Sequence, residues 1–449
     1  MIGHALGRGR FRLRATSDTR PCTAPRARAA KIGRMRALSI ARNLLLLPLA
    51  LACGRAEAQD ITGLYLTWDG DPTTTMVVNW VDLYPDSPDL LLWRREGEGA
   101  WREAVAVQTT VAPTSLQRRR VELAGLAPDA RYEFAIGKAP EAKTAPLAFR
   151  TLPKDLSTRA LRFVNGGDTM ATREMFEAMC RRSTALDPDF VVFGGDLAYE
   201  DGVKATRVVD WLEAWTRTSV AKDRRVVPLV CAIGNHEVRG HYKGKAPVDA
   251  PYYYGLFAGA DGSSTGVLDC GAYLSLVLLD SNHTMAVEGE QARWLERVLD
   301  AREGVQFLFP VYHYPAWGTT KAPKDGTPLD APLAVAIREH WVPLFERHGI
   351  SAAFEHDHHN FKRTHRILAG KRDDERGLLY LGDGAFGVKT RTVPAEGSAW
   401  WLAKAEARNH LWCADLRSDG TATLRAIDDK GEVFDSVELF APRTKPIGP

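Results

Sequence analysis

Five apolar runs between residues 161 and 354 each lead to polar side chains that can bind a metal ion. This recurrence constrains the fold of the chain more than any other feature. Residues 161–164 lead into Gly-Gly-Asp168, and residues 190–193 lead into Gly-Gly-Asp196, with Tyr199 three residues later. Short apolar runs of this kind predict buried strands. Because open α/β sheets present their chemistry at the carboxyl ends of their strands, the pattern predicts a site at one sheet edge.

Three further runs, at residues 226–233, 306–312 and 350–354, continue the series. The polar residues that follow them are Asn235 and His236, then His313, then His356, His358 and His359. Carboxylate, amide and imidazole together suit transition metals better than calcium. Each residue alone has a simpler explanation, such as a helix cap for Asp168 or a turn for Asn235. Their ordered recurrence favours one shared metal centre.

In this order the segments resemble the motifs of the metallophosphoesterase superfamily, and Tyr199 resembles a ligand of its purple acid phosphatase branch. That branch has the motif series GDxG, GDxxY, GNH[DE], VxxH and GHxH. The resemblance implies a dinuclear centre with a ferric ion and a divalent ion (iron, zinc or manganese). The implied ligands are Asp168, Tyr199 and His358 for the ferric ion, Asn235, His313 and His356 for the divalent ion, and Asp196 as the bridge. It also implies an αββα sandwich, in which helices flank two mixed sheets.

The chain departs from these motifs at three positions. Met170 replaces the glycine that closes the first motif, and Val311 stands only two residues before His313. Glu355 replaces the glycine before the histidine pair, and we expect it to add a carboxylate near the metals. The stretch 317–324 has no histidine that could contact phosphate as in the plant members, so no substrate contact is carried over.

The implied chemistry is attack on phosphorus by a metal-bound hydroxide, because metal coordination lowers the pKa of water to about 7. No protein nucleophile is needed. His236 is the candidate general acid for the leaving oxygen, and its alternative is a structural role beside Asn235.

The leading hypothesis is an exported acid phosphatase that hydrolyses small phosphate monoesters. A second hypothesis assigns phosphodiesters or nucleotides to the same dinuclear centre. A third is a non-catalytic binding protein, against which the intact ligand set weighs.

Residues 1–58 resemble a targeting segment and not part of the fold. They hold twelve Lys/Arg and two acids, a charge of +10, which leaves −7 for the remainder of a chain whose total is +3. A basic extension precedes Met35, which is an alternative start. An apolar core at residues 43–52 and the site Ala56-Glu-Ala58 follow, as in a signal peptide. We expect export to the periplasm or medium, with lipoprotein anchoring at Cys53 as the alternative.

The remaining chain predicts two domains. Residues 60–153 contain short alternating strands separated by Asp, Pro and Gly turns, which predicts an all-β sandwich. The sequence around Tyr132 resembles the corner of a fibronectin type III domain. Residues 159–449 form the expected catalytic domain. A negatively charged body gives no nucleic-acid-binding signature, and no stretch after residue 58 is long and apolar enough to span a membrane. Oligomeric state and natural substrate stay open.

Overall fold

The computed structural model describes residues 61–82, 88–138, 146–240, 245–259 and 261–441. The expected targeting segment, including Met35 and Cys53, lies outside the described residues. Among the described residues, no helix combines the length and the apolar character needed to cross a bilayer.

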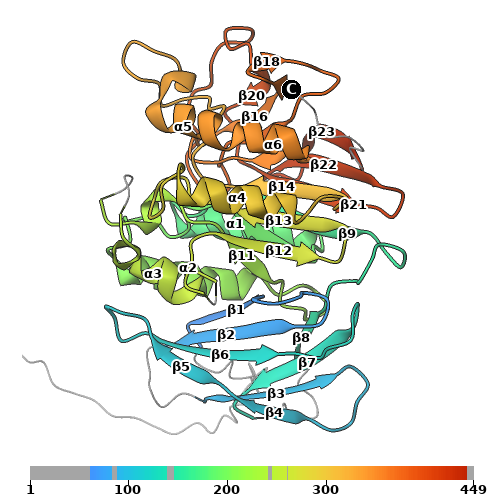
Figure 1. Cartoon of the computed structure of the whole chain (residues 1–449). Coiled ribbons are helices and arrows are strands. Elements are labelled where there is room, and N and C mark those ends of the chain that lie inside the picture. Colours follow the sequence, from blue (N-terminus) through green and yellow to red (C-terminus); the bar gives the residue numbers. More distant parts are fainter. Residues whose placement is uncertain (1–60, 83–87, 139–145, 241–244, 260, 442–449) are drawn as a thin grey trace, which may run out of the picture. The chain divides into compact units, whose positions relative to one another are not determined.

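The N-terminal domain consists of two four-stranded antiparallel sheets, which confirms the all-β prediction (Figure 1). The first sheet has the order β1-β2-β6-β5, with strands Gly63–Thr67, Met76–Asp82, Gln117–Leu123 and Val107–Thr110. The second has the order β4-β3-β7-β8, with strands Arg102–Val105, Leu90–Arg95, Arg131–Ile136 and Leu147–Arg150. Tyr132 is buried, and its hydroxyl accepts a hydrogen bond from the backbone N–H of Ala127 at 2.8 Å. This is the geometry of the tyrosine corner that the sequence predicts.

Two mixed sheets form the C-terminal domain. The six-stranded sheet has the order β11-β10-β9-β21-β22-β23, with strands Leu229–Cys231, Phe190–Phe193, Leu161–Gly166, His410–Leu416, Thr421–Asp428 and Val433–Phe440. The seven-stranded sheet has the order β12-β13-β14-β15-β19-β16-β20, with strands Gly266–Cys270, Leu274–Leu278, Phe307–Val311, Ala353–Phe354, Tyr380–Gly382, Phe361–Thr364 and Leu402–Glu406. A short hairpin joins β17 (Ile367–Leu368) to β18 (Lys371–Arg372).

Apolar side chains fill the space between the two sheets, and helices cover their outer faces. Phe163 and Phe190 of the first sheet pack with Phe309 and Phe354 of the second in one buried cluster. The helices are α1 Arg173–Ala185, α2 Ala205–Thr218, α3 Pro251–Leu256, α4 Glu290–Asp300, α5 Pro332–His340 and α6 Val342–His348. Buried residues of α1 and α2 join the core of the first sheet, and those of α4, α5 and α6 join that of the second (Figure 1). The αββα expectation is therefore confirmed.

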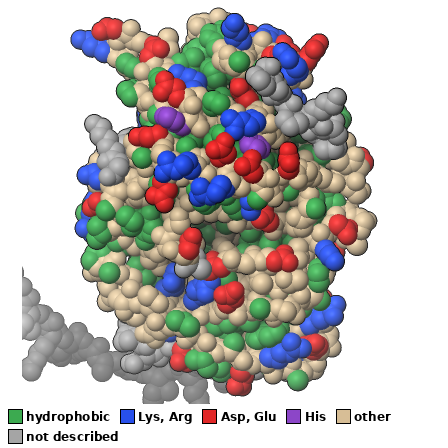
Figure 2. Space-filling model, viewed as in Figure 1, with side chains coloured by type: hydrophobic (Ala, Val, Ile, Leu, Met, Phe, Trp, Pro, Cys, Tyr) green, Lys and Arg blue, Asp and Glu red, His purple; other side chains and the backbone are tan. Residues whose placement is uncertain are grey.

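The parallel strands place their carboxyl ends together. β9, β10 and β11 are mutually parallel in the first sheet, and β13, β14, β15 and β19 are parallel in the second. The segments that follow β9, β10, β11, β14 and β15 carry the polar residues noted in the sequence. The face shown in Figure 2 carries acidic and basic side chains interspersed with one another.

A buried histidine should make the fold sensitive to acid. Burial lowers the pKa of His410 to about 4, and its ring packs against Phe361 and Phe434. Because an unfolded histidine titrates near 6.5, only the unfolded chain gains this proton as the pH falls from about 6.5 towards 4. We expect this residue alone to lower the free energy of unfolding by up to about 3 kcal/mol across that window.

Chemical denaturation of wild type and His410→Phe at several pH values between 7 and 4 measures this effect. The stability difference between wild type and variant should change by up to about 3 kcal/mol, to the disadvantage of the wild type, as the pH falls. Parallel pH dependence of the two proteins would contradict the assignment.

Candidate metal centre

Two loops with the sequence Gly-Gly-Asp meet at the ends of β9 and β10. The backbone N–H of Asp168 donates to the carbonyl of Gly195 at 3.0 Å, and that of Thr169 donates to the carbonyl of Asp196 at 2.9 Å. These bonds hold the two aspartates on neighbouring strand ends. Asp168, Asp196 and His313 each offer a ligand atom within 4.8 Å of the other two, and all three side chains are buried.

A first group of donors surrounds Asp168. Its Oδ1 lies 2.9 Å from Nε2 of His359 and 3.3 Å from the hydroxyl of Tyr199. The tyrosine hydroxyl lies 3.2 Å from the same histidine nitrogen. Burial and the charge of Asp168 raise the pKa of Tyr199 well above its usual value, so the phenol stays neutral unless a strong positive charge binds beside it. Carboxylate, phenol and imidazole thus converge on one point.

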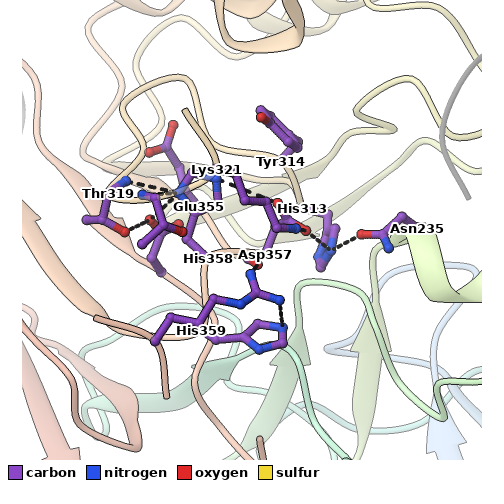
Figure 3. Close-up of polar contacts among 12 residues, drawn as sticks. Asn235, His313, Tyr314, Thr319, Lys321, Glu355, Asp357, His358 and His359 are labelled. Atoms are coloured by element: carbon purple, nitrogen blue, oxygen red, sulfur yellow. Dashed lines mark hydrogen bonds and ion pairs between the residues drawn. The ribbon is translucent and has the colours of Figure 1, made fainter. Parts of the chain in front are cut away.

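A second group surrounds His313 (Figure 3). Its Nε2 lies 3.1 Å from Oδ1 of Asn235 and 3.5 Å from Oδ1 of Asp357. Its Nδ1 lies 2.9 Å from the carbonyl oxygen of Gly194, which fixes the ring and leaves Nε2 directed at the other donors. An amide, an imidazole and a carboxylate therefore converge on a second point.

Asp196 lies next to both groups, because its carboxylate offers a ligand atom within 4.8 Å of those of Asp168 and His313. Its Oδ1 lies 3.2 Å from Nε2 of His313, and its backbone N–H donates to Glu237 at 2.8 Å. Burial alone would raise the pKa of this carboxyl, but His313 and His236 hold it well below its usual range. Although burial lowers the pKa of His313, Asp196 and Asp168 raise it well above 6.5. A carboxylate that stays charged at this depth needs positive charge beside it.

The backbone at these donors adopts a conformation that non-glycine residues seldom use. Asp168, Asp196, Tyr199, Asp357 and His359 have φ angles of 56°, 53°, 61°, 75° and 56°. Such left-handed residues cost stability and cluster at functional sites, where the surrounding structure enforces them. Five of the seven donors therefore share this strained conformation, whereas Asn235 and His313 do not adopt it.

In contrast to the sequence-based ligand assignment, no described hydrogen bond joins the ring of His356 or His358 to a donor of either group. Nε2 of His358 lies 3.7 Å from Oδ2 of Asp357. Nδ1 of His356 lies 2.9 Å from the carbonyl oxygen of Tyr312, and its Nε2 lies 3.2 Å from Oδ1 of Asn165. Its ring packs so closely on the first sheet that a Cβ at Gly194 would lie 1.9 Å from its Cε1. Both nitrogens of His356 thus face protein oxygens.

His358 turns towards the loop that follows β14. Its Nδ1 accepts hydrogen bonds from the backbone N–H groups of Thr319 and Thr320 at 2.9 and 3.0 Å (Figure 3). The positions expected for the two histidines are taken by their neighbours Asp357 and His359, one residue further along. His359 carried a visible signal in the sequence, since it extends the histidine cluster. Asp357 was hidden by its place between two histidines.

Glu355 also differs from the expectation, because it does not add a carboxylate near the metals. It forms a fully buried ion pair with Lys362, and Tyr312 and the backbone of Ala316 donate to its Oε1 at 2.6 and 2.7 Å. The lysine neutralises its charge within the core of the second sheet. Met170, which stands at the other motif position where the family has glycine, is also fully buried.

His236 lies beside Asp196 with its ring partly exposed. Its backbone N–H donates to Oδ1 of Asp196 at 2.8 Å, and its Nε2 lies 3.9 Å from Oδ2 of the same residue. Its Nδ1 contacts Oδ1 of Asp201 at 2.5 Å, and its ring centroid lies 4.4 Å from that of Tyr199. This leaves Nε2 on the side of the donor groups, with 24% of the side chain exposed.

Comparison with known families agrees with this arrangement. A family model described as the N-terminal domain of purple acid phosphatases matches residues 61–151, and one described as calcineurin-like phosphoesterase matches residues 162–383. The chain belongs to the purple acid phosphatase family. The second match contains all seven donors of the two groups, from Asp168 to His359.

A solved purple acid phosphatase from yellow lupin (Lupinus luteus) seeds has the same fold. It superposes with a TM-score of 0.68 and 18% identity, over 84% of this chain and 73% of the lupin chain. Two uncharacterised proteins from Mycobacterium tuberculosis strains CDC 1551 / Oshkosh and H37Rv are each 26% identical over 407 residues. Each alignment covers 80% of this chain and 70% of the mycobacterial protein.

Proposed function

We propose that this purple acid phosphatase homologue is an exported, dinuclear, metal-dependent acid phosphatase that hydrolyses small phosphate monoesters. The observation that carries the proposal is the pair of donor groups on either side of Asp196. The first would hold a ferric ion through Asp168, Tyr199 and His359. The second would hold divalent iron, zinc or manganese through Asn235, His313 and Asp357. Asp196 would bridge them.

The donor chemistry fits these ions. A phenolate is a hard ligand that suits a ferric ion, and imidazole with oxygen donors suits a divalent transition metal. When bound, two such cations supply Lewis acidity that makes hydroxide available near neutral pH and offsets charge on the phosphoryl group. The three buried aspartates Asp168, Asp196 and Asp357 would then lie beside the positive charge that their burial requires.

The residues of the chain also provide for the leaving group. Asp201 holds Nδ1 of His236, so Nε2 is the nitrogen that can carry a proton towards the site. We assign His236 the role of giving this proton to the leaving alkoxide oxygen.

The visible spectrum tests the iron assignment directly. Phenolate coordination to ferric iron should give the purified protein a charge-transfer band. Tyr199→Phe should remove the band, because only the hydroxyl is deleted. Tyr314→Phe is the matched control, since Tyr314 lies near His358 and outside the first group; it should keep the band. A colourless wild type that is active only with added zinc or manganese would refute the iron assignment and leave the proposed hydrolase activity standing.

Substrate class is tested with p-nitrophenyl phosphate and bis(p-nitrophenyl) phosphate at acidic pH. The proposal expects a higher kcat/KM for the monoester. Preference for the diester would assign phosphodiesterase activity to the same centre. Absence of hydrolysis of either ester by metal-loaded protein would refute the enzymatic proposal.

A further inference from the structure

A lysine side chain lies among the donor atoms of the second group. The ammonium of Lys321 forms a close ion pair with Oδ1 of Asp357, the atom that lies 3.5 Å from Nε2 of His313 (Figure 3). Although burial would raise the pKa of the Asp357 carboxyl, Lys321 and His313 hold it well below its usual range. The carboxylate therefore already has a cationic partner supplied by the chain.

The loop that carries Lys321 is fixed to the segment that carries Asp357. Thr319 and Thr320 donate their backbone N–H groups to His358, and the hydroxyl of Thr319 donates to Asn360 at 2.9 Å. These bonds set the start of the loop two residues before the lysine. The Lys321 side chain is 31% exposed, so its ammonium can move outward into water without unfolding the loop.

We propose that Lys321 is a built-in cation that competes with the second metal ion for Asp357. The inference rests on the proposed dinuclear site and concerns how strongly its second position is filled. An ammonium and a divalent cation that approach the same carboxylate oxygen repel each other and compete for its negative charge. We therefore expect a metal ion that binds Oδ1 of Asp357 to displace the ammonium.

This displacement separates the two positions. In the first group Nη2 of Arg391 lies 3.5 Å from Nε2 of His359, but the described contacts of the carboxylate of Asp168 involve no lysine or arginine side chain. The first position should therefore fill at lower metal concentration than the second. Lys321 thus makes the second metal exchangeable and its occupancy dependent on the supply of divalent cation.

Metal titration of Lys321→Met tests the proposal. Methionine keeps an unbranched side chain that is one atom shorter and uncharged, and it makes the same backbone demand at φ 58°. Metal-free wild type and variant are dialysed against increasing Mn²⁺, and bound metal per chain is measured by mass spectrometry. We expect the second equivalent to bind at least about tenfold more tightly to the variant, since desolvated charge–charge interactions exceed 1.4 kcal/mol. Lys324→Met, at an exposed position of the same loop, is the control and should titrate like the wild type.

A second measurement uses the wild-type protein alone. Labelling of Lys321 by an amine-reactive reagent should rise several-fold when the second equivalent of Mn²⁺ binds, whereas labelling of Lys324 should not change. Unchanged second-site affinity in Lys321→Met, or unchanged labelling of Lys321, would overturn the inference. If the wild type binds two metals and hydrolyses phosphate esters in that case, the proposed function stands. A wild type that binds no metal would overturn both.

Discussion

Replacing Asp196 with asparagine should lower kcat/KM for phosphate ester hydrolysis by about 10³-fold or more. The amide has nearly the same volume, and it can still accept the hydrogen bond from the backbone of His236. It loses the negative charge that both donor groups share, so the two cations would face each other without a bridge. We also expect bound metal to fall to one ion per chain or fewer. Steady-state kinetics and metal analysis measure both effects.

Asp189→Asn is the matched control for this variant. Asp189 precedes the same strand, β10, at its opposite end, where it is buried and paired with Arg159 at 2.8 Å. Its replacement should lower stability but leave metal content unchanged. Retention of two metals and normal turnover in Asp196→Asn would refute the shared bridge.

Replacing His359 with alanine should lower the affinity of the first metal position by about 100-fold and abolish the charge-transfer band. The deleted imidazole lies 2.9 Å from Asp168 and 3.2 Å from Tyr199, so the first group loses its nitrogen donor. Metal titration and the visible spectrum give the readout. The thermal stability of the metal-free variant should change little, since no backbone N–H depends on this ring among the described contacts.

His358→Ala and His356→Ala should behave in the opposite way. Loss of the His358 ring leaves the buried N–H of Thr319, at about 1–3 kcal/mol, and the partly buried N–H of Thr320 without their acceptor. Loss of the His356 ring opens a cavity against Gly194. Both variants should unfold at lower temperature and still bind two metals. Loss of metal in these two variants, with retention in His359→Ala, would restore the assignment that the motif match first suggested.

The fold follows from the sequence to a large extent because its signals are local. The apolar run 190–193 becomes strand β10 with the predicted ends. Most of the polar residues after the parallel strands lie close together, whereas the rings of His356 and His358 contact other parts of the chain. Other strands are shorter than their apolar runs: β11 covers only Leu229–Cys231 of the run 226–233. Apolar composition marks where a chain is buried, whereas strand ends depend on which neighbour is available for pairing.

The histidine cluster shows where local reasoning fails. Two overlapping His-x-His-like registers compete in residues 355–359, and the motif match selects the first. The structure selects the second because Asp357 and His359 turn into the left-handed region, at φ 75° and 56°. The choice also depends on distant partners, such as Asn165 for His356 and Thr319 for His358. None of these tertiary contacts is visible in a five-residue window.

The expectation that Glu355 lies near the metals fails for a related reason. A carboxylate adjacent to metal ligands in the sequence suggests a further ligand, but its partner Lys362 lies on the next strand, β16, and faces the same interior. The side chains of consecutive residues at a strand end point to opposite sides of the sheet, so residues adjacent in the sequence can lie in different environments. The glycine of the family motif is thus replaced here by a paired charge that belongs to the core.

The donor groups draw on both sheets of the catalytic domain. Asp168 and Tyr199 follow strands of the first sheet, whereas His313, Asp357 and His359 follow strands of the second. Asp168 accepts the backbone N–H of Asp357 across 189 residues of chain. A pair of cations held here would therefore link the two sheets of the domain. Because ions that bind only the folded state add their binding free energy to its stability, the concentration of metal would then affect the free energy of unfolding as well as the activity.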